Sequence, residues 1–156
     1  SLDSFLAKWD LLSVKGKWQL LLDQDDLPAS TTPWGRLTAI DVSSGEINWQ
    51  IPFGQREPTG DYKIGPGDIN FGGVLVTASG IVFATGTPDN MIRAYDSRSG
   101  KELWRSQLPY AGSAPPMTYM YKGCQYLAVT STGGRFVGFE KWQGDATVAY
   151  RLGTCQ

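Results

Sequence analysis

Histidine is absent from this 156-residue chain. Its imidazole is the commonest general base near neutral pH and the commonest side-chain ligand of transition metals. A Ser-His-Asp triad, a Cys-His pair or a histidine-ligated zinc site therefore cannot be built from these residues alone. Any chemistry that this chain carries must come from carboxylates, lysine, arginine, tyrosine or a bound cofactor.

Cysteine, basic runs and long apolar stretches are also scarce. Cys124 and Cys155 are too few for a disulfide framework and form no CxxC pair, so we expect a strand residue and a tail thiol. The net charge is −1 and no run of Lys or Arg occurs, which argues against nucleic acid as a partner. No stretch approaches the roughly 20 apolar residues of a membrane span. We therefore expect a soluble chain, with any export signal upstream of residue 1.

Glycine, proline and aromatic residues are abundant, a composition typical of many short strands joined by turns. The beginning of the chain differs, because the apolar residues of Leu2–Lys15 have helical spacing and predict a short amphipathic helix. A polar, proline-containing loop follows. We therefore divide the chain into a helix and loop segment, residues 1–32, and a strand-rich part, residues 33–156.

The strand-rich part contains an internal repeat, in which the pattern of Leu37–Trp49 returns in Ile92–Trp104 at an offset of 55 residues. Ala, Asp, Ser, Gly and Trp recur at the same relative positions. The Asp can accept backbone N–H groups at the start of a turn, and the Gly supplies a left-handed backbone conformation. The Trp is a large apolar body that can pack between sheets. Repeats of this length are typical of propellers and solenoids.

Alternating apolar residues around this repeat predict an all-β fold of four-stranded antiparallel sheets. Residues before Gly54 supply two or three strands of an earlier sheet. Together these form a partial β-propeller of about two to three blades, whereas closed propellers have about 4–8. The predicted strands are Gly73–Thr77, Ile81–Thr85, Met91–Tyr95 and Glu102–Ser106 in one sheet, and Met117–Tyr121, Gln125–Thr130, Arg135–Glu140 and Thr147–Leu152 in the next.

Both copies of the repeat resemble the tryptophan-docking motif of the pyrroloquinoline quinone (PQQ) dehydrogenases, or quinoproteins. Asn70–Phe83 is similar to the next-to-last blade of that family, and Ala114–Val129 is similar to its last blade. Thr32–Gly35 is similar to the glucose dehydrogenase branch. The resemblance is colinear over Asp23–Leu152. It implies an eight-bladed propeller with PQQ at its axis beside Ca²⁺, of which this chain forms the carboxy-terminal blades.

The resemblance also implies a reaction. An aspartate base takes the proton of a sugar or alcohol hydroxyl while hydride passes to the quinone, and ubiquinone or cytochrome c then accepts the electrons. Such enzymes are periplasmic. Alone, this chain is expected to be inactive, and its open sheet edges would pair with the remaining blades or self-associate.

Three residues match the family's cofactor surroundings. Asn70 and Phe71 match a pair that contacts the quinone, and Asp89 matches an acidic turn residue near the cofactor pocket. Arg135 stands where glucose-type relatives carry a histidine near the substrate. Simpler structural roles stay open: a loop amide and a core aromatic for the pair, a hairpin turn for Asp89, and a surface position for Arg135.

The catalytic base and the metal ligands have no counterpart in this chain, because the family places them in earlier blades. We therefore assign no catalytic residue and no metal ligand here. A second interpretation is a non-catalytic scaffold propeller, similar to the outer-membrane assembly lipoproteins, which binds partner proteins and no quinone.

Overall fold

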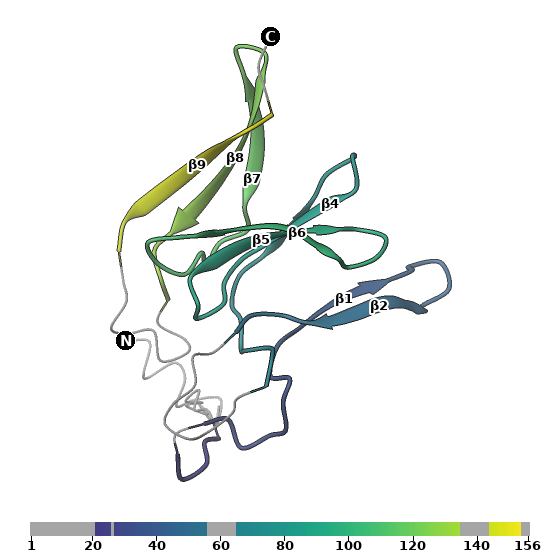
Figure 1. The fold of residues 1–156 in the computed structure, drawn as a ribbon, viewed down its shortest axis with the longest axis vertical. Coiled ribbons are helices and arrows are strands. Elements are labelled where there is room, and N and C mark those ends of the chain that lie inside the picture. Colours follow the sequence, from purple (N-terminus) through teal and green to yellow (C-terminus); the bar gives the residue numbers. More distant parts are fainter. Residues whose placement is uncertain (1–20, 26, 56–64, 135–143, 154–156) are drawn as a thin grey trace, which may run out of the picture.

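The computed structural model describes residues 21–25, 27–55, 65–134 and 144–153. This part of the chain is built of strands and loops arranged in three antiparallel sheets (Figure 1). The helix predicted over residues 2–15 and the strand predicted over residues 135–140 lie outside it. No helix among the described residues is long and apolar enough to cross a membrane.

The described strands form a hairpin, a four-stranded meander and a three-stranded sheet. The all-β prediction is confirmed, and so are the four strands predicted for the middle sheet, to within one residue at their ends. The first sheet is β1 (Arg36–Ile40) and β2 (Ile47–Pro52); the middle sheet is β3 (Val74–Val76), β4 (Ile81–Ala84), β5 (Met91–Asp96) and β6 (Glu102–Gln107), in that order; the third is β7 (Met117–Tyr121), β8 (Cys124–Ser131) and β9 (Ala146–Leu152), in that order.

The third sheet has three described strands, and the fourth strand predicted for it, over residues 135–140, lies outside the described residues. β9 pairs directly with β8, from Gln125 opposite Leu152 to Ser131 opposite Ala146. Ala149-Tyr150 also repeats Ala94-Tyr95 at the offset of 55 residues, so β9 is the counterpart of β5 and not of β6. The repeat is hard to find here because Arg151 stands where the earlier copies have Asp. Alternating apolar residues identify a strand but do not give its place in a sheet.

Both turns of the repeat form as predicted. The Asp41 carboxylate accepts the backbone N–H of Ser43 at 2.8 Å, and the Asp96 carboxylate accepts that of Ser99 at 2.9 Å. The hydroxyls of the same serines donate to the same carboxylates, and these bonds lower the pKa of both aspartates. Gly100 follows with a φ of 69°, in the left-handed region that glycine tolerates best.

Each repeated tryptophan packs its sheet onto the next sheet. The Trp49 indole N–H donates to the Ser97 carbonyl at 2.9 Å, and a Cβ at Gly100 would lie 2.7 Å from the Trp49 ring. Glycine at position 100 therefore allows the ring of the first sheet to lie against the turn of the middle sheet. In the same way, Trp104 of β6 meets Tyr150 of β9 edge to face, at 5.1 Å between ring centroids.

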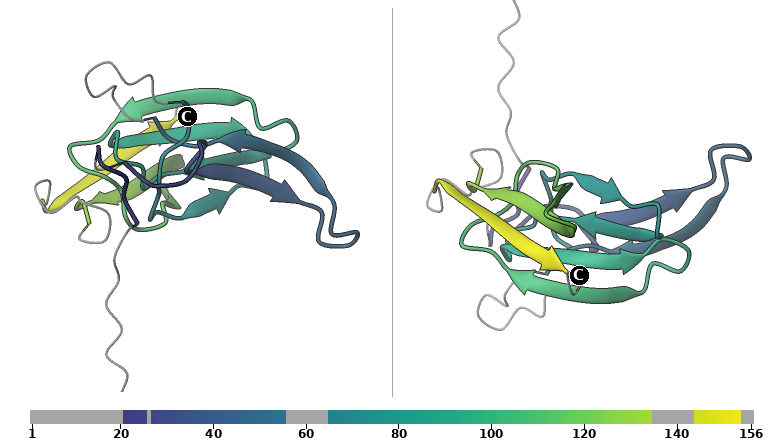
Figure 2. Two further views of the ribbon diagram at one scale, coloured as in Figure 1. Left: turned by 90° about the horizontal axis from the view of Figure 1, so that it is seen from below. Right: turned by 90° about the horizontal axis from the view of Figure 1, so that it is seen from above.

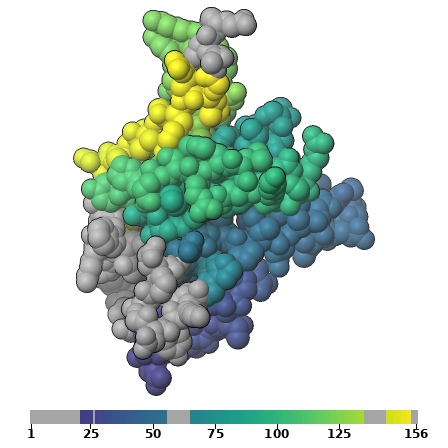
Figure 3. Space-filling model, viewed as in Figure 1, coloured from purple at the N-terminus to yellow at the C-terminus, as the bar shows by residue number. Residues whose placement is uncertain are grey.

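The two central strands of the middle sheet, β4 and β5, are buried on both faces. Val82 and Tyr95 of β4 and β5 belong to one apolar cluster, with Phe53, Leu37 and Ile51 of the first sheet region. Successive residues of a strand point to opposite faces, so the neighbouring residues Phe83, Ile92 and Ala94 enter a second cluster, with Leu108, Leu127 and Val129. The space-filling view shows β6 between β9 and the first hairpin, whose tip projects beyond the other sheets (Figures 2 and 3). The sheets thus pack face to face, as propeller blades do.

Cys124, expected to be a strand residue, begins β8 as predicted and is also disulfide-bonded, which the sequence did not predict. The β8–β9 register explains why: Leu152 lies opposite Gln125, so the end of β9 is beside the first residue of β8. The other cysteine of the sequence, Cys155, follows β9 by three residues and lies outside the described residues. Spacing along the chain did not predict the disulfide, because it is the antiparallel pairing that places the end of β9 beside the start of β8.

Candidate functional site

Phe71 lies in the segment before β3, against the turn between β4 and β5. Its backbone N–H donates to the Gly86 carbonyl at 3.0 Å. The two backbones meet without side chains between them, because a Cβ at Gly72 would lie 1.9 Å from the Thr85 carbonyl oxygen. The Phe71 side chain is 48% exposed, and Asn70 beside it is half-buried. The glycines thus hold a partly exposed aromatic ring and an amide at the edge of this turn.

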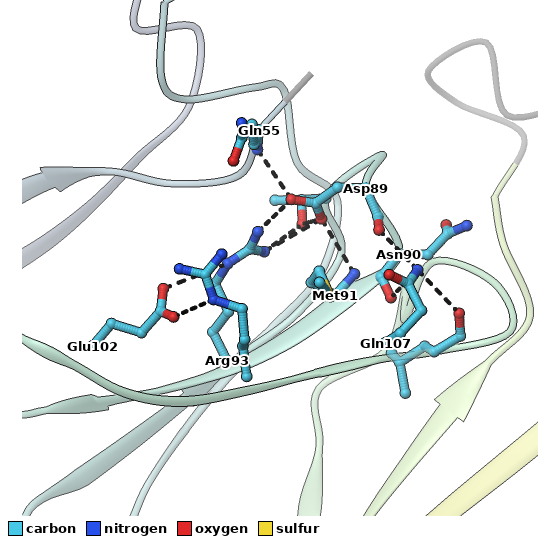
Figure 4. A network of polar contacts seen from close by, with 10 residues as sticks. Gln55, Asp89, Asn90, Met91, Arg93, Glu102 and Gln107 are labelled. Carbon is cyan, nitrogen blue, oxygen red and sulfur yellow. Dashed lines mark hydrogen bonds and ion pairs between the residues drawn. The ribbon is translucent and has the colours of Figure 1, made fainter. Parts of the chain in front are cut away.

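Asp89 lies in the same turn, and its carboxylate is surrounded by protein donors (Figure 4). One oxygen accepts the Thr87 hydroxyl at 2.5 Å and the Met91 backbone N–H at 3.2 Å. The other accepts the Gln55 backbone N–H at 3.1 Å, from the loop that leaves β2. The Arg93 guanidinium bonds both oxygens. Asp89 therefore ties its own turn to β5 and to the first sheet region.

Arg93 is the buried cation of this network, with 4% of the residue exposed. It also donates to the Thr87 hydroxyl at 3.2 Å, and its Nε lies 3.8 Å from a Glu102 carboxylate oxygen. Glu102 in turn accepts from Arg105 at 2.5 Å. Alternating charges thus run from the turn to β6. Arg93 and Glu102 are not among the residues predicted from the sequence, although a charged residue inside an otherwise apolar strand is a signal that could have identified Arg93.

The charges of this network stabilise one another. Burial alone would raise the pKa of Asp89, but the hydrogen bonds from Arg93 and Thr87 and the charge of Arg93 outweigh it and lower the pKa. Burial would likewise lower the pKa of Arg93, and the bond and charge of Asp89 raise it instead. Burial raises the pKa of Tyr95 to about 12, so its phenol stays neutral. At neutral pH Asp89 is therefore an anion that accepts hydrogen bonds and cannot donate one.

Acid is expected to weaken the fold through this carboxylate. The pKa of Asp89 is lower in the folded state than in the unfolded state, where an aspartate has a pKa of about 3.9. Its contribution to stability is therefore fully present above the unfolded-state pKa and is lost as the pH falls through the folded-state pKa. We expect the free energy of unfolding, measured by urea titration, to decrease between pH 5 and pH 2. Asp89→Asn should be less stable at pH 7, because Arg93 loses its counter-charge, and should show a shallower decrease.

Asp145→Asn is the matched control, because Asp145 is exposed and has no ion pair or hydrogen bond from its side chain among the described residues. This variant should keep the pH dependence of the unchanged protein. An equally steep decrease in Asp89→Asn would show that Asp89 is not responsible.

Three of the four predicted site residues thus lie on two adjoining segments. Asn70 and Phe71 precede β3, Asp89 is in the β4–β5 turn, and the Phe71–Gly86 bond joins the segments. Arg135 lies outside the described residues. No group of three or more His, Cys, Asp or Glu side chains that could hold a metal ion occurs in the part that the structure describes. The contact of Asn70, Phe71 and Asp89 with a cofactor stays a prediction.

Comparison with known proteins identifies the family. Residues 10–127 match the model of the PQQ glucose/ethanol/alcohol dehydrogenase β-propeller domain. The chain belongs to this family. It is 37% identical over 134 residues to a probable quinate dehydrogenase (quinone) of Xanthomonas campestris pv. juglandis, a match that covers 81% of this chain and 17% of that protein.

Other PQQ family members agree with this assignment. The quinoprotein glucose dehydrogenase of Escherichia coli is 33% identical over 132 residues, covering 81% of this chain and 16% of its own length. The crystal structure of the quinohemoprotein alcohol dehydrogenase from Comamonas testosteroni superposes with a TM-score of 0.53 at 28% identity, covering 82% of this chain and 17% of that one. The chain therefore spans a minor part of the length of its PQQ-dependent relatives.

The described residues fit one edge of a PQQ site. PQQ is a planar aromatic quinone with carboxylate groups, so a partly exposed aromatic ring next to an amide offers it a flat apolar surface and a hydrogen-bond donor. Phe71 and Asn70 provide these groups. Asp89 fits less directly, because donors of the protein already occupy both of its oxygens. Its bonds hold the turn that lies beside Phe71.

Proposed function

We propose that this chain forms the carboxy-terminal blades of a PQQ-dependent dehydrogenase that oxidises a hydroxyl group of a sugar or alcohol. The observation that carries the proposal is the bond from the Phe71 backbone N–H to the Gly86 carbonyl, which holds Phe71 and Asn70 beside the β4–β5 turn. The tryptophan contacts between the sheets and the match to the PQQ family support it. The relatives named for quinate and glucose oxidation support a polyhydroxylated substrate. PQQ would supply the hydride acceptor for this reaction and Ca²⁺ would supply a Lewis acid.

This chain's own residues would bind and orient the cofactor. The Phe71 ring would cover one part of the quinone and exclude water from it, while the Asn70 amide would donate a hydrogen bond to its rim. Asp89 and Arg93 would keep the neighbouring turn in place. Arg135 is proposed to contact the substrate. The base that removes the hydroxyl proton and the ligands of Ca²⁺ are expected from other blades.

Reconstitution of the native polypeptide that contains this sequence tests the proposal. After purification without cofactor, it would be titrated with PQQ and Ca²⁺ and supplied with glucose, quinate, glycerol or ethanol and an electron-accepting dye. We expect a change in the quinone absorption spectrum on binding and dye reduction with at least one of these substrates. Absence of any PQQ-dependent spectral change would contradict the enzyme and favour the scaffold interpretation.

We also propose that the protein is periplasmic and passes electrons to ubiquinone or cytochrome c. The disulfide of Cys124 supports an oxidising compartment, since disulfides persist there and are rare in the cytosol. Thiol labelling of fractionated cells tests this location. Cys124 should be unreactive until a reductant is added, in the periplasmic fraction; a reactive Cys124 in the cytosolic fraction would contradict it.

A further inference from the structure

We propose that Arg93 is a positioning residue for the cofactor-facing loops: it fixes the β4–β5 turn and, through that turn, the location of Phe71. The proposal rests on the proposed function, because it assigns Phe71 to the quinone site. It adds a residue that lies outside the site itself and acts through Asp89 and Thr87.

Arg93 is bonded directly to the β4–β5 turn. Its guanidinium bonds both oxygens of Asp89 and, at 3.2 Å, the hydroxyl of Thr87. These contacts restrain the turn on both sides of Pro88. The residue before Thr87 is Gly86, whose carbonyl accepts the Phe71 N–H at 3.0 Å. Displacement of the turn would therefore carry the Phe71 backbone with it.

The turn is also connected to the preceding sheet, through Asp89 and Arg93. Asp89, held by Arg93, accepts the Gln55 backbone N–H at 3.1 Å, and the Arg93 guanidinium lies 6.0 Å from the centroid of the Phe53 ring. Arg93 thus holds the turn of residues 86–90 and, through Asp89, residue 55 of the preceding segment. The turn is itself bonded to residues 70–72 through the Phe71–Gly86 hydrogen bond. Figure 4 shows Arg93 beside Asp89 and Asp89 beside Gln55, the contacts that connect the turn to the preceding sheet.

The chemistry of the site calls for arginine rather than lysine. A guanidinium presents five N–H donors in a rigid plane, which lets it bond a carboxylate through two nitrogens and a neighbouring hydroxyl at the same time. An ammonium is a single point charge without that planar geometry. A buried ion pair often adds little net stability compared with apolar residues of the same size, so geometric control is the better account of Arg93 in this core.

The test compares Arg93→Met and Arg93→Lys with Arg36→Met. Arg36 is an exposed strand arginine that donates a 3.4 Å hydrogen bond to Gln50, so its variant makes the same chemical change away from the turn. Two quantities are measured on the native polypeptide containing this sequence: PQQ affinity in the presence of Ca²⁺, and peptide-resolved amide hydrogen exchange.

If Arg93 positions the turn, Arg93→Met lowers PQQ affinity roughly tenfold or more, because a small misplacement of a contact group weakens binding steeply. Arg93→Lys recovers part of the loss, and Arg36→Met shows none. Exchange in Arg93→Met becomes faster at the amides of Gln55, Phe71 and Met91, while Val129 in the third sheet keeps its protection.

Unchanged PQQ affinity in Arg93→Met would overturn the proposal, and so would exchange that rises equally in all three sheets, since that pattern means general destabilisation. If the protein without substitutions binds no PQQ, the proposed function is contradicted, whatever the result for Arg93. The exchange pattern then decides the positioning of Phe71: acceleration confined to Gln55, Phe71 and Met91 supports it, and any other pattern overturns it.

Discussion

Gly72→Ala is expected to lower the free energy of unfolding by about 3 kcal/mol or more, near the upper end of single-residue effects. A methyl group at this position would lie 1.9 Å from the Thr85 carbonyl oxygen and 2.4 Å from its carbonyl carbon. Both obstructing atoms belong to the backbone, so no side-chain rotation relieves the overlap. The segment that carries Phe71 would have to move away from the β4–β5 turn. Urea denaturation followed by circular dichroism measures the change.

Gly45→Ala is the control for this experiment. Gly45 has a φ of 76° and open space where a Cβ would be placed, so the substitution strains the backbone without an overlap. We expect a loss of about 1 kcal/mol there. Similar losses for the two variants would show that the Gly72–Thr85 contact is not as close as described.

Leu127→Ala is expected to lower the free energy of unfolding by about 2–5 kcal/mol, the usual range for a truncated core leucine. Leu127 of β8 is fully buried in the cluster that joins the third sheet to Phe83 and Ile92 of the middle sheet. The substitution leaves a cavity between the two sheets, which the rigid strands on either side cannot fill completely. Thermal and urea denaturation both measure the loss.

Met120→Ala, on the neighbouring strand β7, is the matched control. Met120 is 66% exposed, so the free energy of unfolding should change by about 0.5 kcal/mol or less. A small effect of Leu127→Ala, close to that of Met120→Ala, would mean that the third sheet does not pack on the middle one. The face-to-face arrangement of these sheets would then be wrong.

The features that the sequence predicted well are local ones. The Asp41 and Asp96 turns form because each carboxylate bonds residues two or three positions further along, and such bonds depend on sequence spacing alone. The four strands of the middle sheet could be placed for the same reason, since short turns fix their order. Trp49 was recognised as an inter-sheet residue because its repeat implied a second sheet of the same kind.

The features that the sequence did not predict depend on contacts between distant segments. The Gln55 bond to Asp89 spans 34 residues and exists only when the first two sheets are packed together. Arg93 gains its role from partners on the turn and on β6. The disulfide of Cys124 depends on the register of β8 and β9. The sequence did not give the pairing partner of β9 for a similar reason, because pairing is a property of two strands.

The mass of the native polypeptide tests the central claim that these sheets are the last blades of a larger propeller enzyme. It can be measured on a denaturing blot of source cells, with an antibody raised against this 17.1 kDa chain. The account predicts a single band several times heavier than 17.1 kDa, because three open sheets need further blades to close a ring. A band at the mass of the chain itself would contradict it.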